Sequence, residues 1–158
     1  MTSDELTMFA QRYAKAWCSQ NPESVAAFFA ERGSISINNG PPAVGRAAIA
    51  KEAEAFMTTF PDMVVTMDKV VHDEEGTKFR WILTGTNTGP GGTGNRVRIS
   101  GYELWKIDNG AGGSRATWTG KPERVEEQGY ESINDGLVAE SKGHFDATDY
   151  ERQLKGTS

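Results

Sequence analysis

The last part of the chain places a carboxylate at the junction between two predicted elements. Polar and apolar residues alternate up to Phe145, as in a strand, and the residues after Asp146 have the pattern of a helix. A carboxylate at such a junction either caps the helix or faces a pocket beside it. In an apolar pocket, loss of hydration raises the pKa of a carboxylate toward the range that general acid/base catalysis needs. Asp146 is therefore a candidate catalytic residue and equally a candidate N-cap.

Two more residues are candidates for proton transfer or for contact with a ligand. His144 shares strand parity with Asp146, which is compatible with a second acid/base group or a residue that orients the substrate, and equally with a solvent-facing strand end. Glu103 falls on a strand face that is otherwise apolar, where an isolated charge is costly to bury. We expect Glu103 either to pair with Arg80 or Arg98 on a neighbouring strand or to contact a ligand in a pocket.

Composition narrows the classes of partner. The formal net charge of the 158 residues is -5, which argues against nucleic acid. One cysteine, Cys18, and two histidines predict neither a disulfide framework nor a metal site. The acidic first residues are not followed by the apolar segment of a signal peptide, and no run of roughly 18 apolar residues is present. We expect a cytoplasmic protein with no membrane partner and no metal or cofactor.

The first 60 residues have the periodicity of helices. Thr2 and Glu5 form a capping box ahead of apolar residues at helical spacing, and Asn21-Pro22 starts a second helix with Phe28 and Phe29 on its buried face. A third helix ends at Pro61. We expect helices at about 3–19, 22–32 and 45–59, with a short strand at 34–38.

Alternation with a period of two dominates from residue 63 onward. Phe79, Trp81 and Leu83 share one face of a strand. We expect strands at about 63–72, 79–84, 97–107 and 137–145, followed by a final helix. This order predicts the α+β class, with N-terminal helices packed against a curved mixed or antiparallel sheet in a cone-shaped half-barrel. Such a shape leaves a cavity between sheet and helices.

Residues 108–132 interrupt the strand pattern. Glycine and charged residues dominate this stretch, where a tight turn would be sufficient. We expect one domain over 1–158 with a solvated surface insertion at 108–132. The alternative is that Trp118 and Tyr130 bring the insertion onto a pocket mouth or a neighbouring subunit.

Four segments are similar, in order and spacing, to one known family. They are Pro61–Thr66 (PDMVVT), Arg80–Gly89 (RWILTGTNTG), Val97–Gly101 (VRISG) and the tail, where Asp146 follows six residues after Glu140 and Arg152-Gln153-Leu154 comes next. Together they resemble the SnoaL-like polyketide cyclase family within the nuclear-transport-factor-two-like superfamily. The resemblance covers most of the chain outside 108–132 and implies the same cone-shaped α+β barrel that periodicity indicates.

The resemblance also implies a range of chemistry. Members of the superfamily include aldol cyclases, epoxide hydrolases, ketosteroid isomerases, dehydratases and binding domains without catalysis. In the cyclases an aspartate after the last strand is the general acid/base, and Asp146 occupies the matching position. Two positions depart from the family pattern, since Lys142 stands where Trp is usual and His144 where an apolar residue is common.

These observations predict binding of a small, largely apolar, carbonyl-bearing molecule in the cone cavity. If the protein is an enzyme, it performs cofactor-free acid/base chemistry such as aldol cyclisation, isomerisation or hydration. Asp146 is then the principal acid/base, with His144 or Tyr102 as helper. The residues expected to bind the substrate are Trp81, Leu83, Tyr102, Glu103 and Phe145. The alternative function is a non-catalytic ligand-binding or dimerisation module of the same fold.

The outer face of the predicted sheet is too apolar for a fully hydrated surface. It carries Ile82, Thr84, Thr86, Tyr102 and Leu104, and proteins of the superfamily commonly pair through this face. We therefore expect a homodimer that uses it.

Overall fold

The computed structural model describes residues 2–108 and 136–156, so the insertion expected at 108–132 lies, apart from its first residue, outside the described residues. None of the helices in the described ranges has the length and hydrophobicity needed to cross a membrane. The elements, in chain order, are α1 (Ser3–Trp17), α2 (Pro22–Ala26), β1 (Phe29–Ile37), β2 (Ala43–Val44), α3 (Arg46–Thr59), β3 (Val64–Asp73), β4 (Gly76–Thr86), β5 (Arg96–Asp108), β6 (Leu137–Phe145) and α7 (Ala147–Lys155).

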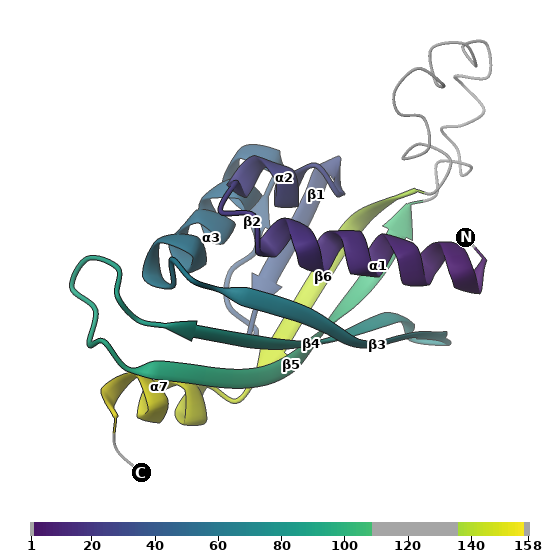
Figure 1. The fold of residues 1–158 in the computed structure, drawn as a ribbon. Coiled ribbons are helices and arrows are strands. Elements are labelled where there is room, and N and C mark those ends of the chain that lie inside the picture. Colours follow the sequence, from purple (N-terminus) through teal and green to yellow (C-terminus); the bar gives the residue numbers. More distant parts are fainter. Residues whose placement is uncertain (1, 109–135, 157–158) are drawn as a thin grey trace.

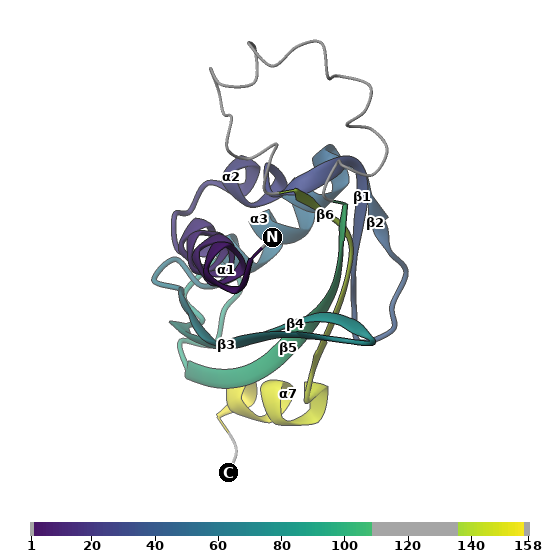
Figure 2. The same ribbon diagram turned by 90° about the vertical axis from the view of Figure 1, so that its right-hand side faces the viewer.

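The strands form one curved mixed sheet. Their order is β2-β1-β6-β5-β4-β3, with β1 parallel to β6 and the other neighbours antiparallel. Helices α1, α2 and α3 lie on the concave side, and α7 lies against the opposite face (Figures 1 and 2). This arrangement confirms the expected α+β half-barrel.

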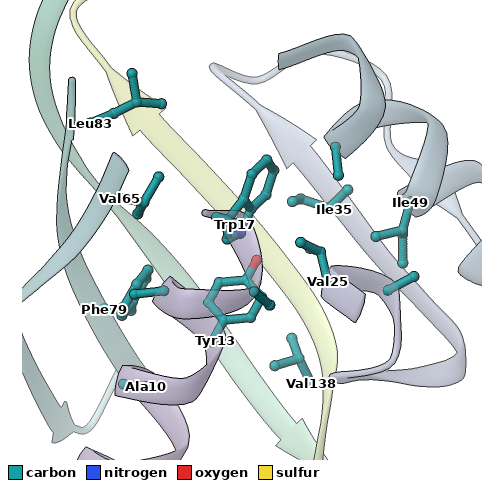
Figure 3. Close-up of a cluster of buried hydrophobic side chains, with 14 of the residues drawn as sticks. Ala10, Tyr13, Trp17, Val25, Ile35, Ile49, Val65, Phe79, Leu83 and Val138 are labelled. Atoms are coloured by element: carbon teal, nitrogen blue, oxygen red, sulfur yellow. The ribbon is translucent and has the colours of Figure 1, made fainter. Parts of the chain in front are cut away.

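Helix α1 begins as its capping box predicts. The Thr2 hydroxyl accepts a hydrogen bond from the Glu5 N–H (3.1 Å), and the Glu5 carboxylate accepts one from the Thr2 N–H (2.8 Å). The helix then buries an apolar stripe that includes Tyr13 and Trp17. Figure 3 shows these two side chains projecting from α1 among the side chains of the sheet.

The second helix is shorter than predicted. It ends at Ala26, and the fully buried Phe29 is the first residue of β1 rather than part of a helical face. A Cβ at Gly33 would lie 2.8 Å from the Val138 carbonyl oxygen, so Gly33 allows β1 to approach β6 closely. The prediction that this helix continues to residue 32 was wrong because strand pairing with β6, distant in sequence, decides the conformation here.

An aromatic cluster fills the space between α1 and the sheet. Phe79 and Trp105 are stacked with ring centroids 4.9 Å apart, and the Tyr13 ring meets both rings edge-on at 5.3 and 5.2 Å. All three side chains are fully buried. The cluster fixes the position of α1, and therefore of the polar atoms that α1 carries into the core.

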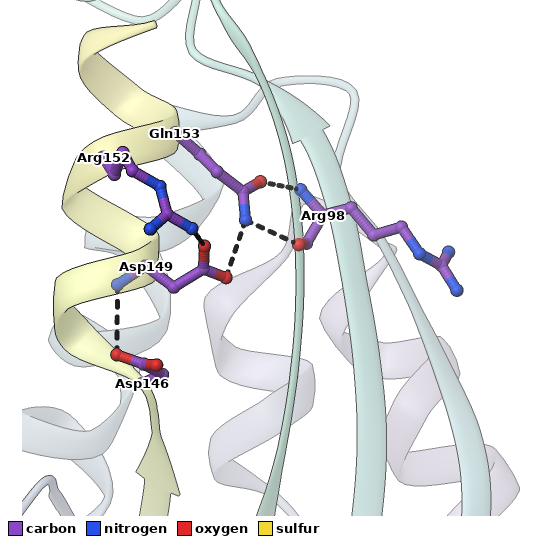
Figure 4. A network of polar contacts seen from close by, with 5 residues as sticks. All are labelled: Arg98, Asp146, Asp149, Arg152 and Gln153. Carbon is purple, nitrogen blue, oxygen red and sulfur yellow. Dashed lines mark hydrogen bonds and ion pairs between the residues drawn. The ribbon is translucent and has the colours of Figure 1, made fainter. Parts of the chain in front are cut away.

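Helix α7 is fastened to the outer face of the sheet by polar contacts (Figure 4). Asp146 is its N-cap, and its Oδ1 accepts a hydrogen bond from the Asp149 N–H at 3.0 Å. Asp149 in turn contacts Arg152 and accepts a hydrogen bond from Gln153 Nε2 at 2.9 Å. Gln153 joins the helix to β5, because its side chain accepts from the Arg98 N–H (2.7 Å) and donates to the Arg98 carbonyl (3.0 Å).

The capping contact gives a stability prediction for Asp146. Asp146→Ala removes the acceptor for the Asp149 N–H and should lower the free energy of unfolding by about 1 kcal/mol, whereas Asp146→Asn should change it by only a few tenths of that, since Asn caps nearly as well. Urea unfolding of the three proteins measures the difference. Equal stability of Asp146→Ala and the unsubstituted protein would contradict the capping role.

Candidate functional site

An apolar cavity of about 60 Å³ lies between the helices and the concave face of the sheet. It is smaller than the engineered cavity of about 150 Å³ that holds benzene in another protein, so a larger guest requires the walls to move. Among the described residues that line it, Glu103 is the only ionisable one. The lining is Trp17, Ile35, Ile37, Phe56, Val65, Phe79, Trp81, Leu83, Ile99, Glu103, Gly143 and Phe145.

The Glu103 carboxylate is held by three donors from three elements. Oε1 accepts from Trp105 Nε1 of β5 (2.8 Å), from the Ser141 hydroxyl of β6 (2.8 Å) and from the Tyr13 hydroxyl of α1 (3.0 Å). Oε2 is 3.2 Å from the same Tyr13 hydroxyl. Glu103 faces Gly143 across the β5–β6 pair, and the missing side chain there leaves room for the carboxylate.

Burial governs the protonation of this group. Loss of hydration raises the pKa of Glu103 above its ordinary value, and the hydrogen bonds from Trp105, Ser141 and Tyr13 offset that rise only in part. Burial, and next the charge of Glu103, raise the pKa of Tyr13 well above its ordinary value. Tyr13 therefore remains a neutral phenol that can donate to the carboxylate.

The expected ion pair between Glu103 and an arginine is absent from the described residues. Arg80 and Arg98 are exposed and belong to the opposite face of the sheet, where the Arg80 guanidinium lies 5.9 Å from the centre of the Tyr102 ring. Strand parity explains this. Arg98 is an odd number of residues from Glu103 along β5, and Arg80 pairs with Tyr102, the neighbour of Glu103, so both arginine side chains point to the other face. The three donors that do reach Glu103 are all uncharged.

Two aromatic rings separate the cavity from a polar groove. Trp81 and Phe145 line both spaces, and their ring centroids are 6.0 Å apart in an edge-on contact. The Phe145 N–H donates to Asn38 Oδ1 at 2.9 Å, which ties the end of β6 to the turn after β1. The groove has a volume of about 490 Å³ and is lined by Asn38, Asn39, Asp68, Arg80, Trp81, Ser100, Gly101, Tyr102, His144 and Phe145.

Gly101 leaves room for the Trp81 ring, which lines both the cavity and the groove. A Cβ at this position would lie 2.3 Å from the His144 carbonyl oxygen and 2.7 Å from Cζ2 of Trp81. A side chain there would push Trp81 out of its position, so the glycine is a condition for the aromatic wall.

The structure divides the residues expected at the site into three places. Trp81, Leu83, Glu103 and Phe145 line the cavity. Tyr102 and His144 lie together in the groove, with ring centroids 5.1 Å apart. Asp146 is exposed at the start of α7 and lines neither space. The catalytic assignments of Asp146 and His144 stay predictions.

Tyr13, Trp17 and Ser141 were not identified from the sequence as site residues. Their spacing predicts that Tyr13 and Trp17 lie on the core face of a helix, and Ser141 falls within a predicted strand. One signal could have found them: a carboxylate on an apolar strand face requires hydrogen-bond donors, and a buried tyrosine hydroxyl requires a partner.

The arrangement fits proton transfer inside an apolar space. A buried carboxylate with a raised pKa, accepting bonds from neutral donors, can take up and return a proton. Across residues 2–108 and 136–156, no group of three or more His, Cys, Asp or Glu side chains is arranged to hold a metal ion.

The amino-acid sequence matches the model of one protein family. The model of the SnoaL-like domain matches residues 10–111. Comparison with curated protein sequences gives no match. Among the solved structures with a similar fold are three whose identities to this chain are too low to transfer a function.

The first is a provisionally assigned SnoaL-like polyketide cyclase from Jannaschia sp. CCS1, with a TM-score of 0.70 and 12% identity over 98% of this chain and 94% of that one. The second is TsrD from Streptomyces laurentii, with a TM-score of 0.69 and 14% identity over 98% and 97%. The third is a hypothetical protein with a ketosteroid isomerase-like fold from Catenulispora acidiphila, in complex with trimethylamine, with a TM-score of 0.68 and 14% identity over 100% and 96%. Because the family model covers more than half of the chain, this protein belongs to the SnoaL-like domain family and has its ketosteroid isomerase-like fold.

Proposed function

We propose that this protein binds a small, largely apolar, carbonyl-bearing molecule in its cavity and that Glu103 exchanges a proton with it. The observation that carries the proposal is that a buried carboxylate with a raised pKa projects into an otherwise apolar lining. Such an environment selects apolar guests and shifts a carboxylate toward the protonation behaviour of a general acid/base.

The proposed chemistry needs no group beyond the side chains of the cavity. The ionised Glu103 carboxylate takes a proton from the carbon next to the carbonyl, which leaves an enolate and a neutral carboxyl group. If the carboxyl returns the proton to a different carbon, the outcome is an isomerisation. If the enolate carbon instead attacks a second carbonyl of the same molecule, a carbon–carbon bond forms and the new alkoxide takes the proton, which is an aldol cyclisation.

The two carboxylate oxygens are placed for different roles. Oε1 accepts three hydrogen bonds, from Trp105, Ser141 and Tyr13, which fix its position. Oε2 has one longer contact, from the Tyr13 hydroxyl at 3.2 Å. Because an ionised carboxylate oxygen has two lone pairs, Oε2 keeps acceptor capacity for a substrate proton.

Trp81 and Phe145 give the proposed ligand its access route. Rotation of these two rings would join the 60 Å³ cavity to the polar groove on their other side. An amphipathic molecule could then place its reacting part beside Glu103 and a polar end beside Tyr102 and His144. In this proposal His144 contacts the ligand, and Asp146 acts as the cap of α7.

Ligand binding without chemistry is the second candidate, and one observation favours it. Three hydrogen bonds to one oxygen stabilise the ionised carboxylate and reduce its basicity. The two candidates share the cavity and differ in whether Glu103 transfers a proton.

Proton exchange on a bound ketone separates them. In deuterated water, the unsubstituted protein should speed deuterium uptake at the carbons next to the carbonyl of cyclopentanone, followed by NMR. Glu103→Gln should reduce the protein-dependent rate by roughly 10²–10⁴-fold, because the amide cannot accept the proton. Asp146→Asn is the matched control and should keep the rate. Uptake that is unaffected by Glu103→Gln and lost in Asp146→Asn would overturn the proposal.

The raised pKa of Glu103 also predicts a dependence of stability on pH. In the unfolded chain this group titrates near the ordinary value of 4.5, and in the folded protein at a higher pH. Between these two pH values the folded state binds more protons than the unfolded state. The contribution of Glu103 to the free energy of unfolding therefore falls as the pH rises through this window, and above the window it stays constant. Glu103→Gln retains an acceptor oxygen and should gain stability relative to the unsubstituted protein from pH 4 to pH 8, measured by urea unfolding. A difference that shrinks over this range would contradict the raised pKa.

We also propose a homodimer through the outer face of the sheet. Ile82, Tyr102 and Leu104 are only half-buried there in the single chain, and α7 covers the face near Arg98. Light scattering at micromolar concentration should give about twice the 17.2 kDa mass of the chain. A measured mass equal to that of a single chain would contradict this proposal.

A further inference from the structure

One residue of the cavity lining, Trp17, carries a buried indole N–H. Trp17 is 8% exposed and lines the cavity, and its Nε1 has no hydrogen-bond partner among the described groups. It is the only buried side-chain nitrogen or oxygen in residues 2–108 and 136–156 that lacks one. Buried donors in folded proteins almost always have an acceptor, so this group calls for an explanation.

The surroundings of Trp17 supply a polar neighbour but no adequate acceptor. Tyr13 lies one helical turn earlier, and the two rings meet edge-on with centroids 6.3 Å apart. The nearby indole N–H lowers the pKa of the Tyr13 phenol, but no hydrogen bond joins the two side chains. The Tyr13 hydroxyl itself donates to Glu103. Tyr13 therefore contacts both the Trp17 ring and the Glu103 carboxylate. Figure 3 shows Tyr13 and Trp17 projecting from the same helix.

We propose that Trp17 Nε1–H is the donor for the carbonyl oxygen of the cavity ligand. The inference rests on the proposed function and adds the residue that orients the ligand, with its carbonyl toward Trp17 and its acidic carbon toward Glu103. A neutral donor in an apolar space selects a neutral acceptor, which specifies a ketone or aldehyde rather than a hydrocarbon. The same bond strengthens as negative charge develops on the carbonyl oxygen during proton removal.

Two probes of one shape test the inference directly. Cyclopentanone carries an acceptor oxygen, and methylenecyclopentane has a CH₂ group in its place. In the unsubstituted protein, cyclopentanone should bind roughly fivefold to tenfold more tightly, the range that one net hydrogen bond supplies. Only cyclopentanone should move the indole ¹H–¹⁵N signal of Trp17 downfield, read against the other three of the four tryptophans.

Two variants complete the test. Trp17→Phe should abolish the preference for the ketone while leaving the affinity for methylenecyclopentane within about twofold. Asp146→Asn is the control, because Asp146 lines neither the cavity nor the groove, and this variant should keep the preference. Equal affinities for the two probes in the unsubstituted protein, or a preference that survives Trp17→Phe, would overturn the role of Trp17 alone. Failure of both probes to bind would overturn the proposed function with it. If Trp17→Phe does not fold, the indole signal of the unsubstituted protein decides.

Discussion

The burial of one carboxylate is the constraint on which this structure depends. Glu103 lies in an apolar core, where an ion without partners would be prohibitively costly. Tyr13 from α1, Trp105 from β5 and Ser141 from β6 satisfy it, so the same three contacts join the first helix to the centre of the sheet. Because the donors are neutral, the carboxylate is held in place without the strong fall in pKa that an arginine would cause. The group is thus a structural link and, among the described residues that line the cavity, the only ionisable one.

The aromatic packing around this group makes the site part of the core rather than of a loop. Tyr13, Phe79 and Trp105 are fully buried in mutual ring contacts. Close packing keeps the donors in register with the carboxylate, and it also leaves a cavity of only about 60 Å³. In the proposed function a larger molecule enters by displacing Trp81 and Phe145, whose edge-on ring contact lies between the cavity and the groove.

Local patterns in the sequence predicted the α+β class, most of the elements and part of the cavity lining. The period of two along β4 placed Trp81 and Leu83 on the inner face, and a lone acid on the apolar face of β5 marked Glu103. The partners of Glu103 could not be predicted, because Tyr13 and Ser141 are 90 and 38 residues away along the chain. Local sequence predicted Asp146 as a possible N-cap of α7. The side of the sheet on which α7 lies could not be predicted in this way, because it depends on the contact between Gln153 and Arg98. Pairing between distant strands likewise decided that Phe29 belongs to β1.

Glu103 is a desolvated carboxyl group held by neutral donors, and its pKa is raised. A ¹³C NMR titration of the side-chain carboxyl carbons, with the Glu103 signal assigned by its loss in Glu103→Gln, measures this most directly. The expected result is a midpoint clearly above the ordinary 4.5 of a glutamate, with the other glutamates as internal references. A midpoint at or below 4.5 would show that the hydrogen bonds outweigh the burial and would contradict the role of Glu103 as the acid/base of the cavity.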